Sequence, residues 1–322
     1  MKVHFLNPGS IEQISGGYIF NKHFVLSLSA NVQEFYLHEI NDLQEMDSVV
    51  FEEEDLFILD SLLFFKDYNV SASFMKGKNV IPLIHLSDGL QNPNDVRKEG
   101  LLLAGLRVIV TSSFVKNQLQ NDFGILGDDI LVVEPGVAAI PKKEIYQEKI
   151  QHFVCVSNFV ERKRILELLQ ILNELREYDW TLELIGDAKI EESYARLIID
   201  FIEEQGLSDR VKVSTPLEQK ELFEVMLGKD MLLHLAAYET FGMCIFEAAA
   251  MGLPILSTKT GAWEDLKTYP LAGFIAVDDL SAYKKALEHV LTSKFVKLEN
   301  ELIHQEMYGW NQMAEKFLTW LS

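Results

Sequence analysis

Residues 238–262, YETFGMCIFEAAAMGLPILSTKTGA, decide the fold class of this chain. They follow the apolar run DMLLHLA (residues 230–236), which predicts a buried strand. After a short loop, the alanine-rich MCIFEAAAM predicts a helix that ends at Gly252, with Pro254 beyond it. A strand, a tight loop and a helix in this order direct free backbone amides and the positive end of the helix toward a ligand above the sheet.

Two carboxylates flank this loop. Glu239 lies in the expected loop and Glu247 in the expected helix. Backbone amides between them can hold a phosphate while the carboxylates accept hydrogen bonds from sugar hydroxyls. The simpler alternative is a generic strand, turn and helix whose glutamates are only solvated. The whole pattern favours a site for a neutral polyol joined to a phosphate.

The rest of the chain alternates short apolar runs with amphipathic segments, which predicts an α/β fold with mostly parallel sheets. Strands are expected within residues 2–7, 57–65, 80–86, 106–113, 128–137, 152–159, 182–187, 211–216, 230–236, 253–258 and 273–277. Helices are expected within 15–30, 114–124, 165–178, 192–206, 219–228 and 302–322. A length of 322 residues favours two domains, here 1–145 and 146–322, joined near the charged segment 138–151.

Composition restricts the class of partner. The formal net charge of −20 disfavours nucleic acid and anionic membranes, both of which select Lys and Arg. The two cysteines, Cys155 and Cys244, lie in apolar runs and are expected to be reduced core thiols of a cytoplasmic protein. The apolar run at the N-terminus is too short for a signal peptide, and no run is long enough for a membrane span.

The stretch from Glu239 through Glu247 to the corner at Ala262 resembles the donor-site signature of the family 4 nucleotide-sugar glycosyltransferases. These are retaining enzymes of the GT-B fold. The resemblance implies two Rossmann-like domains that face each other across a cleft, an acceptor-side domain before a donor domain. It also implies that the final helix can cross back to the first domain.

The resemblance also assigns roles to residues of this stretch. Glu239 would lie near the donor sugar, and Glu247 would hold the ribose hydroxyls. The backbone amides that would meet the sugar and the phosphates belong to Phe241, Gly242 and Met243.

A basic run, SNFVERKRI (residues 157–165), follows the first strand of the second domain. Cations at the start of a helix are unfavourable for its dipole, so a bound diphosphate would explain Lys163 and Arg162. A solvated run of charges is the alternative. Lys163 matches the lysine of the family pattern. Asn158, also an expected donor-binding residue, stands where an arginine is common, so binding of the diphosphate by two cations is in doubt.

Four further residues match the family more weakly. Gly16 and Gly17, after the first strand, would let amides approach a phosphate, or form an ordinary loop. His85, at the end of a strand, resembles a donor-sugar contact and is not expected to be a general base; a loop histidine is the alternative. Gly186 resembles a corner near the nucleotide base, although turn chemistry explains it equally well.

The resemblance implies metal-independent, retaining transfer of a hexose from a nucleoside diphosphate sugar to an acceptor hydroxyl. Glu239, Lys163 and His85 are the expected catalytic residues, with no metal and no cofactor. A nucleotide-sugar-binding protein that has lost transfer and a nucleotide-sugar epimerase are the alternatives. The expected acceptor is a glycan, a lipid-linked acceptor or a small molecule, and no nucleic acid is expected as a partner. Residues 1–145 carry 11 Lys and Arg against 20 Asp and Glu, so strong membrane binding is not expected.

Overall fold

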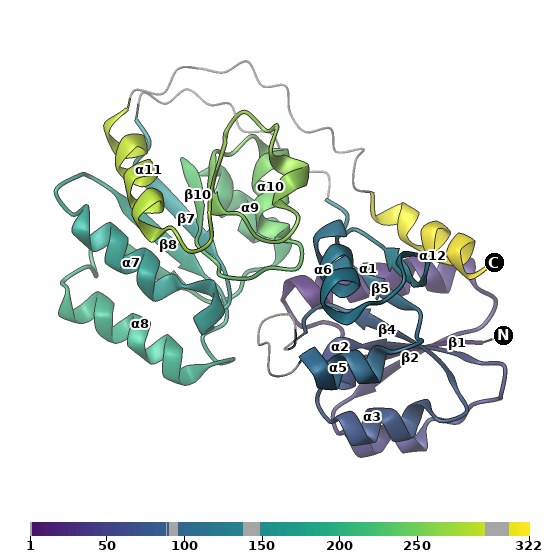
Figure 1. Ribbon diagram of the computed structural model, residues 1–322. Coiled ribbons are helices and arrows are strands. Elements are labelled where there is room, and N and C mark those ends of the chain that lie inside the picture. Colours follow the sequence, from purple (N-terminus) through teal and green to yellow (C-terminus); the bar gives the residue numbers. More distant parts are fainter. Residues whose placement is uncertain (1, 88, 90–95, 138–148, 294–308) are drawn as a thin grey trace. The chain divides into compact units, whose positions relative to one another are not determined.

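The computed structural model describes residues 2–87, 89, 96–137, 149–293 and 309–322. They form two compact units (Figure 1). Unit 1 comprises Met1–Gly136 together with Tyr308–Ser322, and unit 2 comprises Val137–Met307. The expected boundary near residue 145 and most of the expected linker lie outside the described residues.

Unit 1 contains a six-stranded parallel sheet in the order β2-β1-β3-β4-β5-β6. The strands are β1 (Val3–Pro8), β2 (Phe35–Ile40), β3 (Leu56–Asp60), β4 (Asn79–Ile84), β5 (Val108–Val110) and β6 (Ile130–Val132). The helices are α1 (Gly16–Asn31), α2 (Ser61–Phe64), α3 (Tyr68–Met75), α5 (Val96–Leu103), α6 (Ser113–Phe123) and α12 (Met313–Leu321). The strand order reverses between β1 and β3, and open sheets of this kind bind ligands at the carboxyl ends of the strands beside such a reversal.

Unit 2 contains a second six-stranded parallel sheet, in the order β12-β11-β10-β7-β8-β9. The strands are β7 (His152–Val156), β8 (Thr181–Ile185), β9 (Val211–Ser214), β10 (Met231–His234), β11 (Ile255–Thr258) and β12 (Ala272–Ile275). The helices are α7 (Ile165–Glu174), α8 (Glu192–Glu204), α9 (Gln219–Leu227), α10 (Met243–Met251) and α11 (Leu280–Thr292). This is the Rossmann strand order, and its reversal lies between β7 and β10.

The central strands are buried on both faces, which explains their nearly continuous apolar sequences. Every residue of β3 and of β10 is buried. In unit 2 the side chains of Trp180 and Phe153 belong to the core beneath α7 and α8. Burying one such large apolar side chain contributes about 1.5–3 kcal/mol relative to leaving it exposed. The predicted α/β fold with parallel sheets is therefore confirmed.

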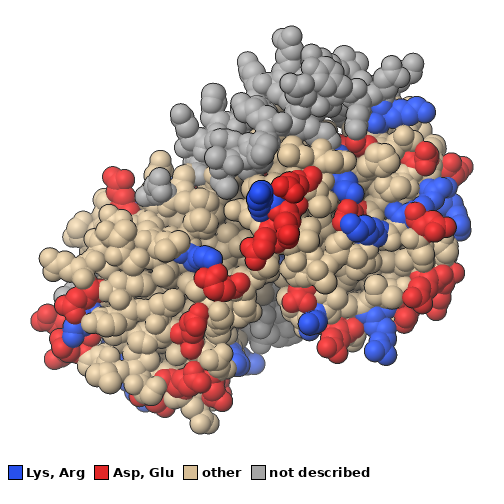
Figure 2. All heavy atoms as spheres, turned by 180° about the vertical axis from the view of Figure 1, so that it is seen from behind, with Lys and Arg blue, Asp and Glu red and all other residues tan. Residues whose placement is uncertain are grey.

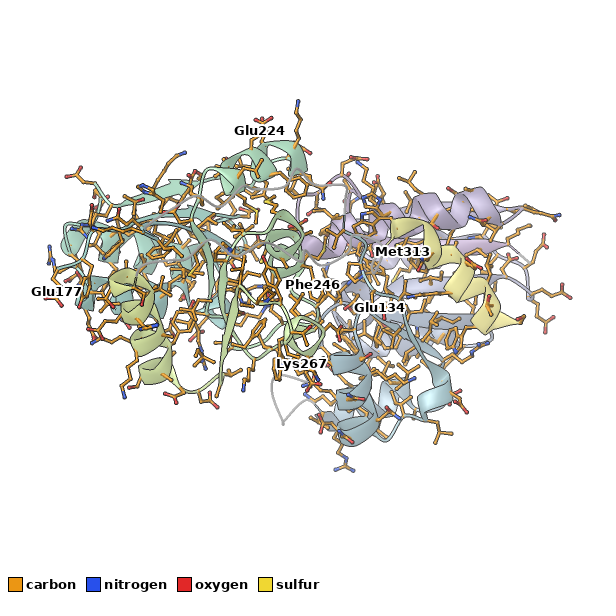
Figure 3. The ribbon with its side chains drawn as sticks, turned by 90° about the horizontal axis from the view of Figure 1, so that it is seen from above. Glu134, Glu177, Glu224, Phe246, Lys267 and Met313 are labelled. Atoms are coloured by element: carbon orange, nitrogen blue, oxygen red, sulfur yellow. The ribbon has the colours of Figure 1, made fainter. Side chains whose placement is uncertain are left out.

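The last helix of the chain, α12, packs on α1 within unit 1 (Figure 1). The ring of Phe317 lies 5.7 Å from that of Phe24, and both side chains are buried. Lys316 Nζ lies 2.6 Å from a carboxylate oxygen of Glu134. Figure 3 labels Glu134 together with Met313, the buried first residue of the helix. The apolar face of α12 thus completes the core of unit 1.

One predicted strand is too long. The sequence predicts a strand or its continuation over residues 57–65, but β3 ends at Asp60. The carboxylate of Asp60 accepts a hydrogen bond of 2.8 Å from the amide of Leu62, which starts α2. A capping side chain inside an apolar run therefore ends the strand.

Within the described ranges, no helix combines the length and the apolar character that crossing a bilayer requires.

Candidate functional site

The strand reversal of unit 2 brings two loops together. The β7 loop (residues 157–164) follows β7, and the β10 loop (residues 235–242) follows β10, which pairs directly with β7. The amide of Ala237 donates a hydrogen bond of 2.8 Å to the carbonyl of Arg162, so the two loops also share backbone contacts. The predicted basic run and the first predicted carboxylate therefore meet at the carboxyl edge of one sheet.

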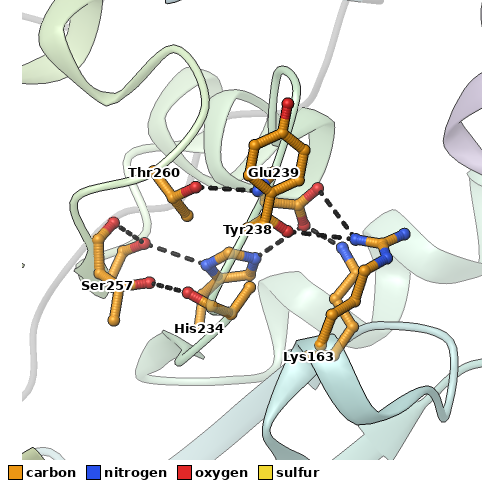
Figure 4. Close-up of polar contacts among 9 residues, drawn as sticks. Lys163, His234, Tyr238, Glu239, Ser257 and Thr260 are labelled. Atoms are coloured by element: carbon orange, nitrogen blue, oxygen red, sulfur yellow. Dashed lines mark hydrogen bonds and ion pairs between the residues drawn. The ribbon is translucent and has the colours of Figure 1, made fainter. Parts of the chain in front are cut away.

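Glu239 and Lys163 form the ion pair at the centre of this edge (Figure 4). Lys163 Nζ donates to Glu239 Oε1, and both side chains are 11% exposed. Arg162 Nη1 lies 3.9 Å from Glu239 Oε2 and donates a hydrogen bond of 3.2 Å to the carbonyl of Tyr238. Burial alone would raise the pKa of Glu239, but Lys163, the neighbouring histidine and Arg162 hold it well below its usual range. The site therefore combines an ionised carboxylate with two cations.

His234, the last residue of β10, belongs to the same cluster and was not predicted. Its Nε2 lies 3.0 Å from Glu239 Oε1, and its Nδ1 lies 3.1 Å from Ser257 Oγ on β11 (Figure 4). Thr260 Oγ1 accepts a hydrogen bond of 2.8 Å from the Glu239 amide. A histidine at the end of an otherwise apolar strand, five residues before Glu239, is the signal that points to it.

The loop between the two carboxylates depends on Gly242. This residue has φ of +95°, a left-handed conformation that side chains other than glycine rarely adopt, and it caps the start of α10. The ring of Phe241 stacks on Phe246 at a centroid distance of 4.3 Å; Phe246 is labelled in Figure 3. Met243 is the first residue of α10. The predicted strand, loop and helix are present, and α10 begins directly after the loop.

Glu247 lies in the second turn of α10 and is buried. Burial raises the pKa of its carboxyl to about 7, against a smaller opposing effect of a hydrogen bond with Gln219. Its carboxyl therefore changes charge near neutral pH, whereas Glu239 stays ionised.

Asn158 and Gly186 hold two loops of this edge together. Asn158 Oδ1 accepts a hydrogen bond of 3.2 Å from the amide of Asp187, which follows β8. A Cβ at Gly186 would lie 1.9 Å from the carbonyl oxygen of Ser157. Asn158 thus has a structural role in addition to its predicted donor contact. Glycine is needed at position 186 because the backbone of the loop after β8 approaches that of the β7 loop so closely.

The comparison with known families gives a direct match. The family model described as "Glycosyl transferases group 1" matches residues 138–306, more than half of the chain. The chain belongs to this family. The matched range contains Lys163, Glu239 and Glu247, and the predicted family resemblance is confirmed.

Two curated relatives illustrate the similarity of this group 1 glycosyltransferase to named proteins. A human subunit of phosphatidylinositol N-acetylglucosaminyltransferase is 36% identical over 169 residues, which cover 51% of this chain and 34% of the relative. The gpi3 subunit of the Schizosaccharomyces pombe phosphatidylinositol N-acetylglucosaminyltransferase is 31% identical over 120 residues, 35% of this chain and 26% of the relative. The matches thus span about a quarter to a third of these relatives' length.

Solved structures resemble the chain over its whole length. Anabaena HepE, solved in complex with UDP and glucose, matches with a TM-score of 0.72 at 16% identity, covering 100% of this chain and 99% of that one. The sucrose-phosphate synthase of Thermosynechococcus elongatus matches with a TM-score of 0.71 at 14% identity, covering 99% and 94%. At these identities the likeness shows the fold, which is the predicted α/β fold of the GT-B type with two Rossmann-like units.

The residues predicted in unit 1 are His85, which directly follows β4, and the glycine pair at the start of α1, the helix after β1. The side-chain amide of Asn21 donates to Asn7 Oδ1 at 2.8 Å and to Asp60 Oδ2 at 2.7 Å. Its Oδ1 lies 2.6 Å from His85 Nε2, which must therefore carry a proton. Burial lowers the pKa of His85, against the effect of Asp60, so the ring is neutral and Nδ1 is an acceptor. Gly17 lies against this ring.

Gly16 is the first residue of α1 and follows Ser15 in extended conformation. Like Gly17, it has no left-handed φ, so the pair does not form the strained turn that glycine alone allows. In this group 1 glycosyltransferase the two glycines bring the amino end of α1 to the edge of the unit 1 sheet next to His85.

Both cysteines of the chain lie in unit 2, Cys155 on β7 and Cys244 on α10. Cys155 is buried, and burial raises the pKa of its thiol to about 12. Cys244 is only half-buried, in the first turn of α10, so the prediction of two core thiols is half right. Among the described residues, no group of three or more His, Cys, Asp or Glu side chains is arranged to hold a metal ion.

Proposed function

We propose that this chain transfers a hexose from a nucleoside diphosphate sugar to an acceptor hydroxyl, with retention at the anomeric carbon and without a metal ion or cofactor. The observation that carries the proposal is the buried Lys163 and Glu239 pair, with Arg162 beside it, at the strand reversal of unit 2. This is the place where Rossmann-type sheets bind nucleotides, and it holds positive charge where a diphosphate needs it.

The diphosphate leaving group gains negative charge as the bond to the sugar breaks. Lys163 Nζ has three donor hydrogens, so it can bind a phosphate oxygen while it remains paired with Glu239. Arg162 and the amides of Gly242 and Met243 at the start of α10 add further stabilisation. The charge that grows in the transition state is thereby neutralised without a metal ion.

The two carboxylates have different tasks in this proposal. Glu239, ionised and tightly held, orients the sugar so that its anomeric carbon faces the acceptor. Glu247, in the second turn of α10, accepts hydrogen bonds from the ribose hydroxyls. In unit 1, His85 presents Nδ1 as an acceptor for a sugar hydroxyl, and Gly16 and Gly17 place backbone amides at the start of α1.

The relatives support the choice of donor and leave the acceptor open. Anabaena HepE was solved with UDP and glucose. The curated relatives bear names of sugar transferases and synthases that differ in acceptor, among them N-acetyl-alpha-D-glucosaminyl L-malate synthase of Bacillus anthracis. We therefore propose a nucleotide sugar as the donor. The acceptor can be a glycan, a lipid-linked acceptor or a small molecule.

Incubation with a panel of UDP-, GDP- and ADP-sugars tests the function. Release of nucleotide only when an acceptor alcohol is added, with a glycoside of retained anomeric configuration, is the expected result. Interconversion of the nucleotide sugars without acceptor would make the chain an epimerase. Binding without turnover across a broad acceptor panel would make it a binding protein.

Donor binding is expected to tighten as the pH rises from 6 to 8. With a pKa of about 7, Glu247 is ionised to about one tenth at pH 6 and about nine tenths at pH 8, and only the carboxylate accepts from both ribose hydroxyls. The Kd for the nucleotide sugar, measured by calorimetry, should fall about tenfold. The diphosphate diester does not titrate in this range, so the change belongs to the protein.

Glu247→Gln is the matched control, and its Kd should not follow this pH trend. An equal trend in both proteins would contradict the assignment. The same pKa shift has the opposite sign for stability: because the folded state holds the proton more tightly, this group's contribution to stability decreases as the pH rises from 4.5 to about 7.

We also propose that the enzyme works in the cytoplasm and does not bind anionic membranes strongly. Free thiols fit a reducing compartment. Figure 2 shows one face of the molecule, on which Lys and Arg side chains are scattered among Asp and Glu. Co-sedimentation with anionic vesicles at physiological salt should leave most of the protein in the supernatant, since a net charge of −20 is repelled by such a surface. Strong pelleting would overturn this proposal.

A further inference from the structure

His234 has no task in the transfer reaction as proposed, although it is a buried polar group in the centre of the unit 2 sheet. It is the last residue of β10 and 1% exposed. Its two ring nitrogens face different partners, Glu239 on one side and Ser257 on the other. Burying an imidazole is unfavourable unless both nitrogens are satisfied, so this placement requires a reason.

The partners fix the position of the ring proton. Glu239 is an ionised carboxylate, which can only accept, so the ring nitrogen 3.0 Å away must donate. Burial lowers the pKa of His234, and Lys163 and Arg162 add to this effect, against the opposing influence of Glu239. The ring is therefore neutral, with its proton on Nε2, and Nδ1, which lies 3.1 Å from Ser257 Oγ, is its acceptor side.

The result is a chain of hydrogen bonds that runs across two strands into the β10 loop. The Ser257 hydroxyl on β11, which also donates to the Thr258 carbonyl at 3.1 Å, lies beside His234 Nδ1, and His234 donates to Glu239 Oε1 (Figure 4). Lys163 donates to the same oxygen from the β7 loop. Thr260 holds the backbone amide of Glu239 from the other side. Two donors on Oε1 and one contact on the backbone amide restrain the carboxylate, and its Oε2 lies on the side of Arg162.

We infer that His234 is a positioning residue that aims the Glu239 carboxylate at the donor sugar. This inference rests on the proposed function. His234 touches no substrate itself; it acts through the one carboxylate oxygen that it shares with Lys163. A residue in the core of the sheet thereby fixes the position of the Glu239 side chain in the loop. This support is needed because a small displacement of a group in the active site can lower the reaction rate strongly.

Two substitutions of His234 distinguish the contribution of Nε2, which bonds Glu239, from that of Nδ1, which faces Ser257. In His234→Gln the side-chain amide nitrogen reaches the place of Nε2 and keeps the bond to Glu239. In His234→Asn the amide reaches only the place of Nδ1, so it keeps the contact with Ser257 and loses the one with Glu239. The Gln variant should retain most of the kcat for sugar transfer, while the Asn variant should lose about 10- to 100-fold, the loss expected for a hydrogen bond to a charged group.

Binding of the free nucleoside diphosphate, which has no sugar, should be the same in both variants, and the melting temperatures serve as the control for folding. Equal kcat in the two variants, or loss that follows only the melting temperature, would overturn the positioning role. An inactive wild-type enzyme in the donor panel would instead contradict the proposed function.

The ring proton is measured independently of activity by nitrogen-15 NMR of histidine-labelled protein, with His234→Gln assigning the signal. The inference predicts a neutral ring with the proton on Nε2 throughout pH 6–8. A proton on Nδ1, or a doubly protonated ring, would overturn it even if the enzyme transfers sugar.

Discussion

Replacing Lys163 by methionine is expected to lower kcat/KM for sugar transfer by about 10²- to 10³-fold, the range found when one group that stabilises transition-state charge is removed. The lysine binds the diphosphate before the reaction and more strongly as the leaving group gains charge, so both donor affinity and rate should fall. Steady-state kinetics with the preferred nucleotide sugar measure both.

The same substitution leaves the buried Glu239 carboxylate without its main partner. Unit 2 should therefore lose about 3–5 kcal/mol of stability in urea unfolding, as is usual when one side of a buried ion pair is removed. The double variant Lys163→Met with Glu239→Gln removes both charges and should recover most of this stability while staying poorly active.

Lys212→Met is the matched control for the substitution at Lys163. Lys212 also pairs with a buried carboxylate of unit 2, Glu183, but its own side chain is 69% exposed and it lies on β9, which is not next to the strand reversal. It should leave transfer unchanged. Normal turnover in Lys163→Met would show that the basic run is a solvated surface and not a diphosphate site.

Replacing Gly186 by alanine is expected to be the most damaging small substitution in unit 2. The added Cβ would lie 1.9 Å from the carbonyl oxygen of Ser157 and 2.5 Å from its carbonyl carbon, and both are backbone atoms. The β7 and β8 ends would have to separate, with loss of the bond between Asn158 and the Asp187 amide. Overpacking of this kind costs about 3 kcal/mol or more.

Urea unfolding followed by circular dichroism measures the effect. Gly228→Ala is the control in the same unit, because its Cβ would lie 3.3 Å from the nearest atom and its φ is negative. That variant should change stability by less than about 1 kcal/mol. Equal stability of the two variants would contradict the close approach of the β7 and β8 loops.

The donor motif could be predicted from sequence because each of its parts has a local cause. The apolar run ending at His234 gives β10, and Gly242 and Gly252 bound α10, both with left-handed φ. Glu239 and Lys163 are 76 residues apart in sequence, and only the parallel pairing of β7 with β10 brings them together. The Rossmann-like pattern made that pairing predictable.

Two elements that were not predicted, β2 and α3, lack such local signals, whereas the amphipathic helix α11 was missed although the Asp279 side chain caps its start. Only the last residue of the edge strand β2, FYLHEI, is buried, and the strand carries charge, so no long apolar run marks it. Helix α3, YNVSASFM, has few strong helix formers and depends on the Asp67 side chain, which accepts from the amides of Asn69 and Val70.

The role of His234 and that of Asn158 were hidden for a related reason. Each side chain bonds a residue on another strand or loop, and sequence spacing does not show such partners. The hydrophobic pattern of β10 predicts a buried strand, but it does not indicate that His234 contacts Glu239.

Hydrogen-exchange mass spectrometry of the free and donor-bound protein tests the central claim most directly. Saturating UDP-, GDP- or ADP-sugar, whichever binds, should slow amide exchange in peptides that cover residues 157–164 and 238–247, because these loops would hold the diphosphate and the sugar. The Lys163→Met variant should show weaker protection at equal ligand concentration. Protection confined to other segments, with these two loops unchanged at saturation, would contradict the proposed donor site.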